Sequence, residues 1–242
     1  MSLLAEIRDT LRPGADSRHG PLVPLMVALT FVTGVVDAAS YLELGHVFVA
    51  NMTGNVVFIG FALAGASGLS AWTSLVALGA FILGASGGAK LGARNSDHRG
   101  RLLRGTAAVQ IALMALALIV ALLASEPFSS PVRYALVVPL ALAMGVQNAA
   151  ATSLAVPELT TTVLTKTLTG IASEVGASGG SHSKLGRRMV SVAAMLLGAL
   201  AGGLLVLHVA VAAALALACA LVLAVAFVAH RLSSSRDPWS AP

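Results

Sequence analysis

Polar and ionisable side chains gather in one hydrophobic stretch of the chain, from Thr30 to Asn55. Side chains three or four residues apart share a face of a helix, and Gly34, Asp37, Ser40 and Tyr41 have this spacing. Buried ionisable and amide groups are costly in hydrocarbon. A chain that keeps them there uses them or pairs them, so these four residues are the first candidates for a substrate- or ion-binding site.

Asp37 has two interpretations that the sequence leaves open. As a functional group, its carboxylate would bind a proton or a cation inside a helix bundle and couple it to the movement of a solute. As a structural group, it would be neutral or paired, and it would hydrogen-bond the irregular segment that follows. Both interpretations place the side chain toward the protein interior.

A second polar motif, FVANMTGN, follows at residues 48–55. Its Asn51, Thr53, Gly54 and Asn55 are predicted to line a binding site through side chains and through backbone groups that are not used by a helix. The alternative is a structural break in which the Asn and Thr side chains bond their own backbone.

The second half of the chain carries a weaker copy of these motifs. Its candidate binding residues are Asn148, Thr165 and Lys166. Lys166 either attracts an anion or pairs with Asp37, or it extends its amine to the inner membrane interface.

The composition is that of an integral membrane protein. Of 242 residues, 57% are hydrophobic and 10% are charged, against about 25% charged residues in soluble domains, and the mean hydropathy is +0.89. The formal charge of +5 lies mostly in two loops and the tail, which is typical of cytoplasmic loops rather than of nucleic-acid binding. The single cysteine, Cys219, excludes a disulfide framework and a thiolate metal cluster.

Motifs of enzymes and nucleotide binders are missing from the sequence. There is no HExxH, P-loop or dinucleotide fingerprint. We therefore expect no catalytic residue, no metal, no cofactor and no ATP-driven pumping.

Hydropathy predicts an all-α polytopic membrane protein with about six transmembrane helices and two broken or re-entrant segments. Residues 1–20 are expected to be a cytoplasmic segment with a short interfacial helix, 21–230 a single transmembrane domain, and 231–242 a cytoplasmic, disordered tail. One basic loop is expected over 92–104, and a second is expected to hold Lys184, Arg187 and Arg188. The apolar segments are 22–42, 47–66, 70–91, 105–124, 134–155, 159–177 and a pair that fills 189–230 with a turn near His208.

The two halves of the transmembrane domain, 21–124 and 133–230, align at an offset of about 111 residues. Gly34-Val35-Val36-Asp37 lies over Gly145-Val146-Gln147-Asn148, and the glycines of 70–91 match Gly198 and Gly202. The order of features favours an internal duplication.

The basic loops constrain the topology. If 47–66 and 159–177 do not fully cross the membrane, six helices cross, and both basic loops and both termini are cytoplasmic. Each half then crosses three times, so the halves are inverted relative to each other. Many secondary transporters have this arrangement, with broken segments near the midplane.

One set of residues resembles a known family. The motif G-x-x-D-A-x-S-Y-L followed by FVANMTGN is similar to the signature of the YoaK-type family of bacterial integral membrane proteins, long a domain of unknown function. The resemblance implies an inner-membrane protein of about six helices, often described as a permease, with no assigned substrate. In the second half, the family tends to have Thr-Gly where this chain has Thr165-Lys166. The signature residues here are Gly34, Asp37, Ala38, Ser40, Tyr41, Leu42 and 48–55.

These observations predict a secondary transporter or permease of a small polar solute, coupled to protons through Asp37. Two other classes remain open: a channel with two facing re-entrant constrictions, and a non-transporting membrane protein such as an assembly factor. The expected partners are the lipid bilayer and an unidentified small solute, with no nucleic acid. The glycine-rich faces fit a homodimer as well as packing within one chain.

Overall fold

The computed structural model describes residues 3–14, 17, 19–95, 97–157, 159, 161, 164–176, 185–235 and 237–240. Within these ranges the chain is helical and contains no strand. Six helices are long and apolar enough to cross a membrane, which confirms the predicted all-α class and the predicted number of long helices. They are α2 (Leu22–Glu43), α4 (Ala71–Arg94), α5 (Arg99–Leu123), α6 (Ser130–Leu154), α8 (Leu185–His208) and α9 (Val211–Leu232).

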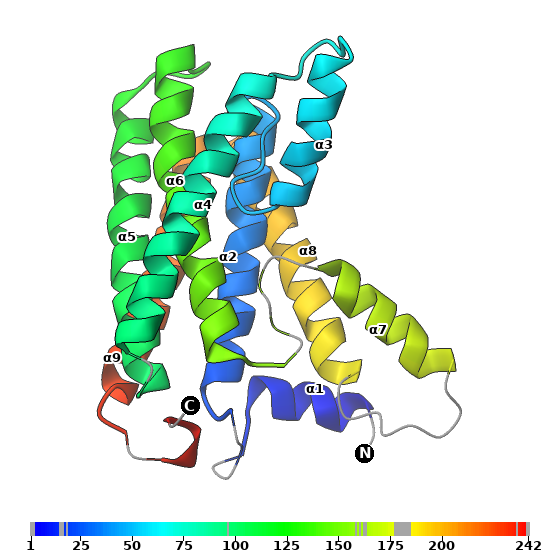
Figure 1. The fold of residues 1–242 in the computed structure, drawn as a ribbon, viewed down its shortest axis with the longest axis vertical. Helices are drawn as coiled ribbons and strands as arrows, with labels where there is room; N and C mark the ends of the chain where they lie inside the picture. The colour runs from blue at the N-terminus through cyan, green and yellow to red at the C-terminus, as the bar shows by residue number, and fades with distance from the viewer. Residues whose placement is uncertain are drawn as a thin grey trace.

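The long helices run alternately up and down in Figure 1, and both marked termini lie at the lower end. Two shorter helices interrupt the alternation. Along the chain, α3 (Met52–Leu63) follows α2 and precedes α4, and it lies at the upper right of the view. Helix α7 (Leu164–Gly176) follows α6 and precedes α8, and it lies to the right of α8. The segment with α3 thus joins two upper helix ends and the segment with α7 joins two lower ones, while the re-entrant path of both segments stays a prediction.

Glycines set the closest helix contacts of the bundle. Helix α2 packs along α8 so tightly that a Cβ at Gly34 would collide with the Met195 carbonyl oxygen and the Ala199 nitrogen. From the other side, a Cβ at Gly198 would meet the Phe31 carbonyl oxygen. Residues without a side chain allow two backbones to approach this closely, so the spacing of the glycines determines which faces meet.

Helices α4 and α6 repeat this contact in the corresponding positions. Gly145 of α6 lies against the Phe81 carbonyl oxygen and the Ala85 nitrogen, while Gly84 of α4 lies against the Leu142 carbonyl oxygen. Each half of the chain thus packs its first long helix on a helix of the other half. These matched contacts support the predicted duplication and inversion, which stay predictions.

The N-terminal helix α1 (Leu3–Leu11) lies under the bundle and packs on α8. Its Glu6 is buried, and Glu6 Oε2 accepts a hydrogen bond from the Gly186 backbone N–H at 3.0 Å. A carboxylate at this position satisfies a free N–H at the start of α8 and complements its positive end. The short helix expected in residues 1–20 is therefore present and fixed to the membrane domain.

The expected loop over 92–104 was wrong, because most of it is helical. Helix α4 continues to Arg94 and α5 begins at Arg99. His98 makes the early start of α5 favourable: its Nδ1 accepts hydrogen bonds from the backbone N–H groups of Gly100 and Arg101. The hydropathy pattern missed this start because the first turns of α5 are basic rather than apolar.

The tail does not fit the expected disorder after His230, because part of it folds back onto the lower end of the bundle. Helix α9 ends at Leu232, and a turn of 3-10 helix, η1 (Pro238–Ser240), follows. Trp239 is 3% exposed, and its Nε1 donates to Asp237 Oδ2 at 3.2 Å. This bond and a second from Ser235 Oγ hold the pKa of the Asp237 carboxyl below its usual range.

Candidate functional site

Asp37 connects α2 to the irregular backbone that precedes α3. Its Oδ1 accepts hydrogen bonds from the backbone N–H groups of Val49, at 3.0 Å, and of Ala50, at 2.8 Å. Asp37 is only 5% exposed, and its second oxygen, Oδ2, is buried and has no hydrogen-bond partner among the residues that the structure describes. One oxygen of the carboxyl group therefore holds the segment, as the structural interpretation expects, while the other has no partner within the described part of the chain.

Asn55 closes the same segment from its other end. Its Oδ1 accepts from the Phe48 backbone N–H at 2.9 Å, and its Nδ2 donates to the Phe48 carbonyl oxygen at 2.7 Å. The Asn55 side chain is fully buried, so these bonds replace contacts with water that the backbone has lost. Residues 48–50 owe their conformation to two side chains that lie outside this short stretch.

Aromatic rings cover this segment. The Tyr41 ring stacks on Phe48 with centroids 5.1 Å apart, and Phe58 of α3 stacks on Phe48 at 5.6 Å. A Cβ at Gly54 would lie 2.7 Å from the Phe48 ring, so Gly54 leaves room for that ring. Both Tyr41 and Gly54 contribute packing to the candidate site.

The remaining candidates of the first half have different surroundings. Ser40 Oγ donates to the Asp37 carbonyl oxygen of its own helix at 3.2 Å, and Gly34 contacts α8. Asn51 precedes α3 and is half-buried, whereas the Thr53 side chain is exposed. Asp37 and Asn55 are thus the two candidates whose side chains bond the irregular segment.

The second-half candidates are less closely associated. Asn148 is half-buried near the end of α6, and Thr165 is exposed in the first turn of α7. The side chain of Lys166 lies outside the part that the structure describes, so the predicted pairing of Lys166 with Asp37 stays a prediction.

A buried polar network crosses the bundle beside Asp37, and the sequence reasoning missed it as a unit. Gln147 Nε2 of α6 donates to Thr33 Oγ1 of α2 at 2.9 Å, and Gln110 Nε2 of α5 donates to Gln147 Oε1 at 2.7 Å. Thr33 lies one helical turn before Asp37. The signal was present in the sequence as isolated amides in apolar helices, but no sequence pattern says that two of them meet.

Metal chemistry has no support in the described residues, because they contain no group of three or more His, Cys, Asp or Glu side chains that would hold an ion.

Long apolar helices around buried polar side chains define a polytopic α-helical membrane protein. Residues 25–228 match the family described as DUF1275, protein of unknown function, and the chain belongs to this family. The chain is also similar to the UPF0700 transmembrane protein YoaK of Bacillus subtilis (strain 168), with 34% identity over 152 residues. That match covers 62% of this chain and 66% of the relative. No solved structure matches the chain significantly.

Proposed function

We propose that this protein is a secondary transporter of a small polar solute, without enzymatic activity, in the inner membrane of a bacterium. Both termini would be cytoplasmic, because most lysines and arginines lie at the lower end of the bundle and positive residues favour the cytoplasmic side. The observation that carries the proposal is the pair of environments around one carboxyl group: Asp37 Oδ1 holds the segment 48–50, and Asp37 Oδ2 is buried with no partner in the described ranges.

This arrangement links the binding of a proton or cation at Asp37 Oδ2 to the position of the segment 48–50. A charged carboxylate oxygen without a partner is costly inside a protein, whereas a bound proton or cation removes much of that cost. Binding at Oδ2 also changes the charge on Oδ1, and hydrogen bonds to a charged acceptor are about twice as strong as neutral ones. Protonation of Asp37 would therefore loosen its hold on Val49 and Ala50, which is the kind of coupling that a carrier needs.

Transport of a solute panel with a proton readout tests this proposal. The full chain would be reconstituted in liposomes that contain a pH-sensitive dye, and radiolabelled sugars, neutral amino acids, acetate and phosphate would be added outside in turn, so that solute and proton movement are both measured. We expect at least one solute to move protons with saturable kinetics, and Asp37→Asn to abolish this movement. Movement of a solute without protons, or equal proton movement by Asp37→Asn, would contradict the coupling.

Two other results would replace the transporter by the alternatives. A current that is linear in voltage and does not saturate with solute would indicate a channel. If none of the solutes moves, with or without protons, in protein that is folded, the non-transporting interpretation is favoured.

A further inference from the structure

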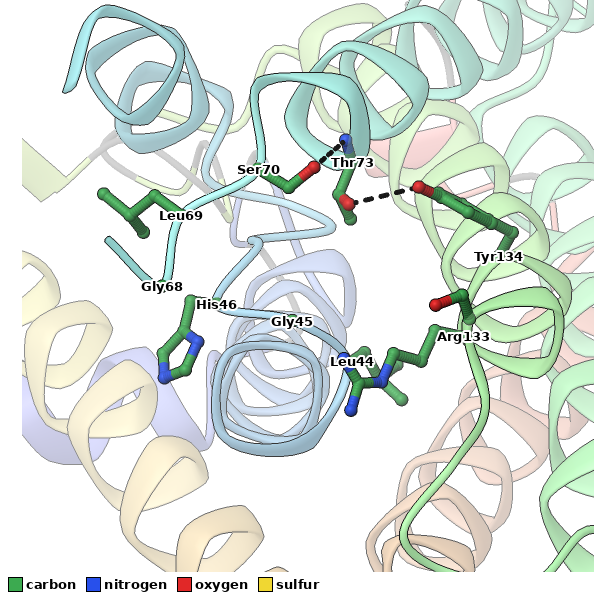
Figure 2. Close-up of a pocket in the computed structure, with 10 residues that line it drawn as sticks. Leu44, Gly45, His46, Gly68, Leu69, Ser70, Thr73, Arg133 and Tyr134 are labelled. Atoms are coloured by element: carbon green, nitrogen blue, oxygen red, sulfur yellow. Dashed lines mark hydrogen bonds between the residues drawn. The ribbon is translucent and has the colours of Figure 1, made fainter. Parts of the chain in front are cut away.

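A polar cavity opens at the upper end of the bundle, away from the Asp37 carboxyl group. Its volume is about 420 Å³, which lies in the range of small-molecule sites, roughly 300–1,000 Å³. The end of α2, the start of α4 and the start of α6 surround it (Figure 2). The residues that line it are Leu44, Gly45, His46, Gly68, Leu69, Ser70, Thr73, Ser130, Arg133 and Tyr134.

Arg133 is the charged group of this cavity. Figure 2 shows its side chain extending from α6 toward Leu44, across the space between the helices. Its Nε is buried and has no hydrogen-bond partner, and within the described residues the guanidinium makes no hydrogen bond or ion pair. No Asp or Glu is among the described residues that line the cavity.

The position of Arg133 is unfavourable unless an anion is nearby. It lies in the first turn of α6, where the positive end of the helix disfavours a cation. The start of α4 adds a second positive helix end, while the last turn of α2 adds a negative one. Since each helix end is equivalent to roughly half a charge, the guanidinium and the two helix starts together outweigh the end of α2 among the groups that line the cavity.

Hydroxyl groups complete the lining. Tyr134 Oη and Thr73 Oγ1 lie 3.4 Å apart and connect the starts of α6 and α4 (Figure 2). Ser70 Oγ accepts from the Thr73 backbone N–H at 3.2 Å and retains its own O–H as a donor. A guanidinium with several hydroxyl donors suits the planar fork of a carboxylate or two oxygens of a phosphate.

We propose that this cavity binds a small oxyanion, a solute with a carboxylate or phosphate group, through Arg133. The inference deepens the proposed function, since an outer cavity is where a transported solute would first bind. A solute with one negative charge that enters with one proton would make transport electrically neutral.

Thermal stabilisation of the purified full chain in detergent measures binding directly. Sodium acetate and sodium phosphate would be titrated at constant ionic strength, with sodium chloride as the balancing salt. We expect one of them to raise the unfolding temperature in a saturable way, which also distinguishes a carboxylate from a phosphate preference. Arg133→Gln should weaken the apparent affinity at least tenfold, whereas Arg101→Gln should not change it.

Arg101 is the matched control because it is exposed at the opposite end of the bundle and pairs with Asp97 at 3.0 Å. If neither anion stabilises the protein more than chloride, or if Arg133→Gln binds as tightly as the unmodified chain, the proposal is overturned. Asp37→Asn should keep anion binding, so that loss of proton coupling and loss of the outer site are separate results.

Thiol chemistry keeps the test decisive if Arg133→Gln does not fold. Ser130→Cys, in a Cys219→Ala background, places a thiol in the cavity lining, and Ser67→Cys places one at the same end outside it. At each position the rate of reaction with an anionic methanethiosulfonate would be divided by the rate with its cationic analogue. This ratio should be severalfold higher at position 130 than at position 67. Acetate or phosphate should slow the reaction at position 130 only. Equal rate ratios at both positions, or no protection by either anion, would reject the site.

Discussion

Asp37 and Asn55 share one task at the scale of single residues, because each bonds backbone that no helix satisfies. A buried backbone group without a partner costs about 1–3 kcal/mol. In the segment 48–50, this cost is avoided by the side chains of Asp37 on α2 and Asn55 on α3. Substitutions at these two positions can therefore separate folding from coupling.

Asp37→Asn and Asp37→Leu should have different effects on stability. The amide oxygen of Asn can accept the same two N–H bonds that Asp37 Oδ1 accepts, so Asn should cost less than about 1 kcal/mol. Leu offers no acceptor and leaves both N–H groups unpaired, at about 1–3 kcal/mol each. Thermal unfolding of the purified variants measures the difference. Equal loss by both variants would mean that the bonds to Val49 and Ala50 contribute little.

Asn55→Leu should destabilise the protein more than Thr53→Val. The leucine would leave the N–H and the carbonyl oxygen of the half-buried Phe48 without their Asn55 partner, at a cost of up to about 1–3 kcal/mol per group. Thr53 is exposed on the same helix, so it is the control. Limited proteolysis would show faster cleavage near residue 48 only in Asn55→Leu, and similar cleavage of both variants would contradict the assigned bonds.

At the scale of helices, the sequence predicted which long helices exist and in what order they follow, but it predicted less well where each helix begins and ends. Long apolar runs identified α2, α4, α6, α8 and α9, because hydropathy is a property of the chain itself. The start of α5 and the folded tail meet through His98, whose ring lies 2.9 Å from the Ser235 carbonyl oxygen and edge-on to Trp239, and hydropathy does not reveal contacts between residues so far apart in the sequence. The same reason explains why Gln110 and Gln147 were not joined, and why the Arg133 cavity was not foreseen.

Glycine substitutions test the packing between helices. A Cβ at Gly84 would collide with the Leu142 carbonyl oxygen of α6, whereas a Cβ at Gly87, on the same helix, would meet open space. Gly84→Ala should therefore destabilise by about 1–3 kcal/mol, which is typical of overpacking, and Gly87→Ala should be neutral or slightly stabilising. Thermal unfolding in detergent compares the two. Tolerance of both substitutions would show that the α4–α6 contact is looser than described.

The buried amides allow a second test between helices. Gln110→Leu would leave Gln147 Oε1 without its donor inside the bundle. Such bonds in membrane proteins average about 0.6 kcal/mol. We therefore expect Gln110→Leu to lower the free energy of unfolding by about 1 kcal/mol in the unmodified chain, and by less in a Gln147→Leu background. The four proteins of this double-mutant cycle would be compared by thermal unfolding. Additive losses would mean that the two amides are not coupled.

At the scale of the whole molecule, helices of each half pack mainly against helices of the other half. Helix α2 of the first half packs on α8 of the second, and α4 packs on α6. The glycines that suggested a dimer face are used in these contacts, so they give no separate argument for a homodimer.

Charge distribution and the alternating helices then predict which end faces which side. In a Cys219→Ala background, Ser67→Cys and Ser129→Cys place thiols at exposed positions of the upper end, and Asp97→Cys and Ser234→Cys do so at the lower end. A membrane-impermeant thiol reagent added to intact cells should label the first pair and leave the second pair protected, because the basic lower end favours the cytoplasm. Each variant would also be labelled after permeabilisation, which shows that its thiol is reactive.

Labelling of the lower pair alone would mean that the protein has the opposite orientation in the membrane and that the Arg133 cavity faces the cytoplasm. Labelling of one position from each pair would mean that α3 or another segment crosses the membrane, and the proposal of two inverted three-helix halves would fail.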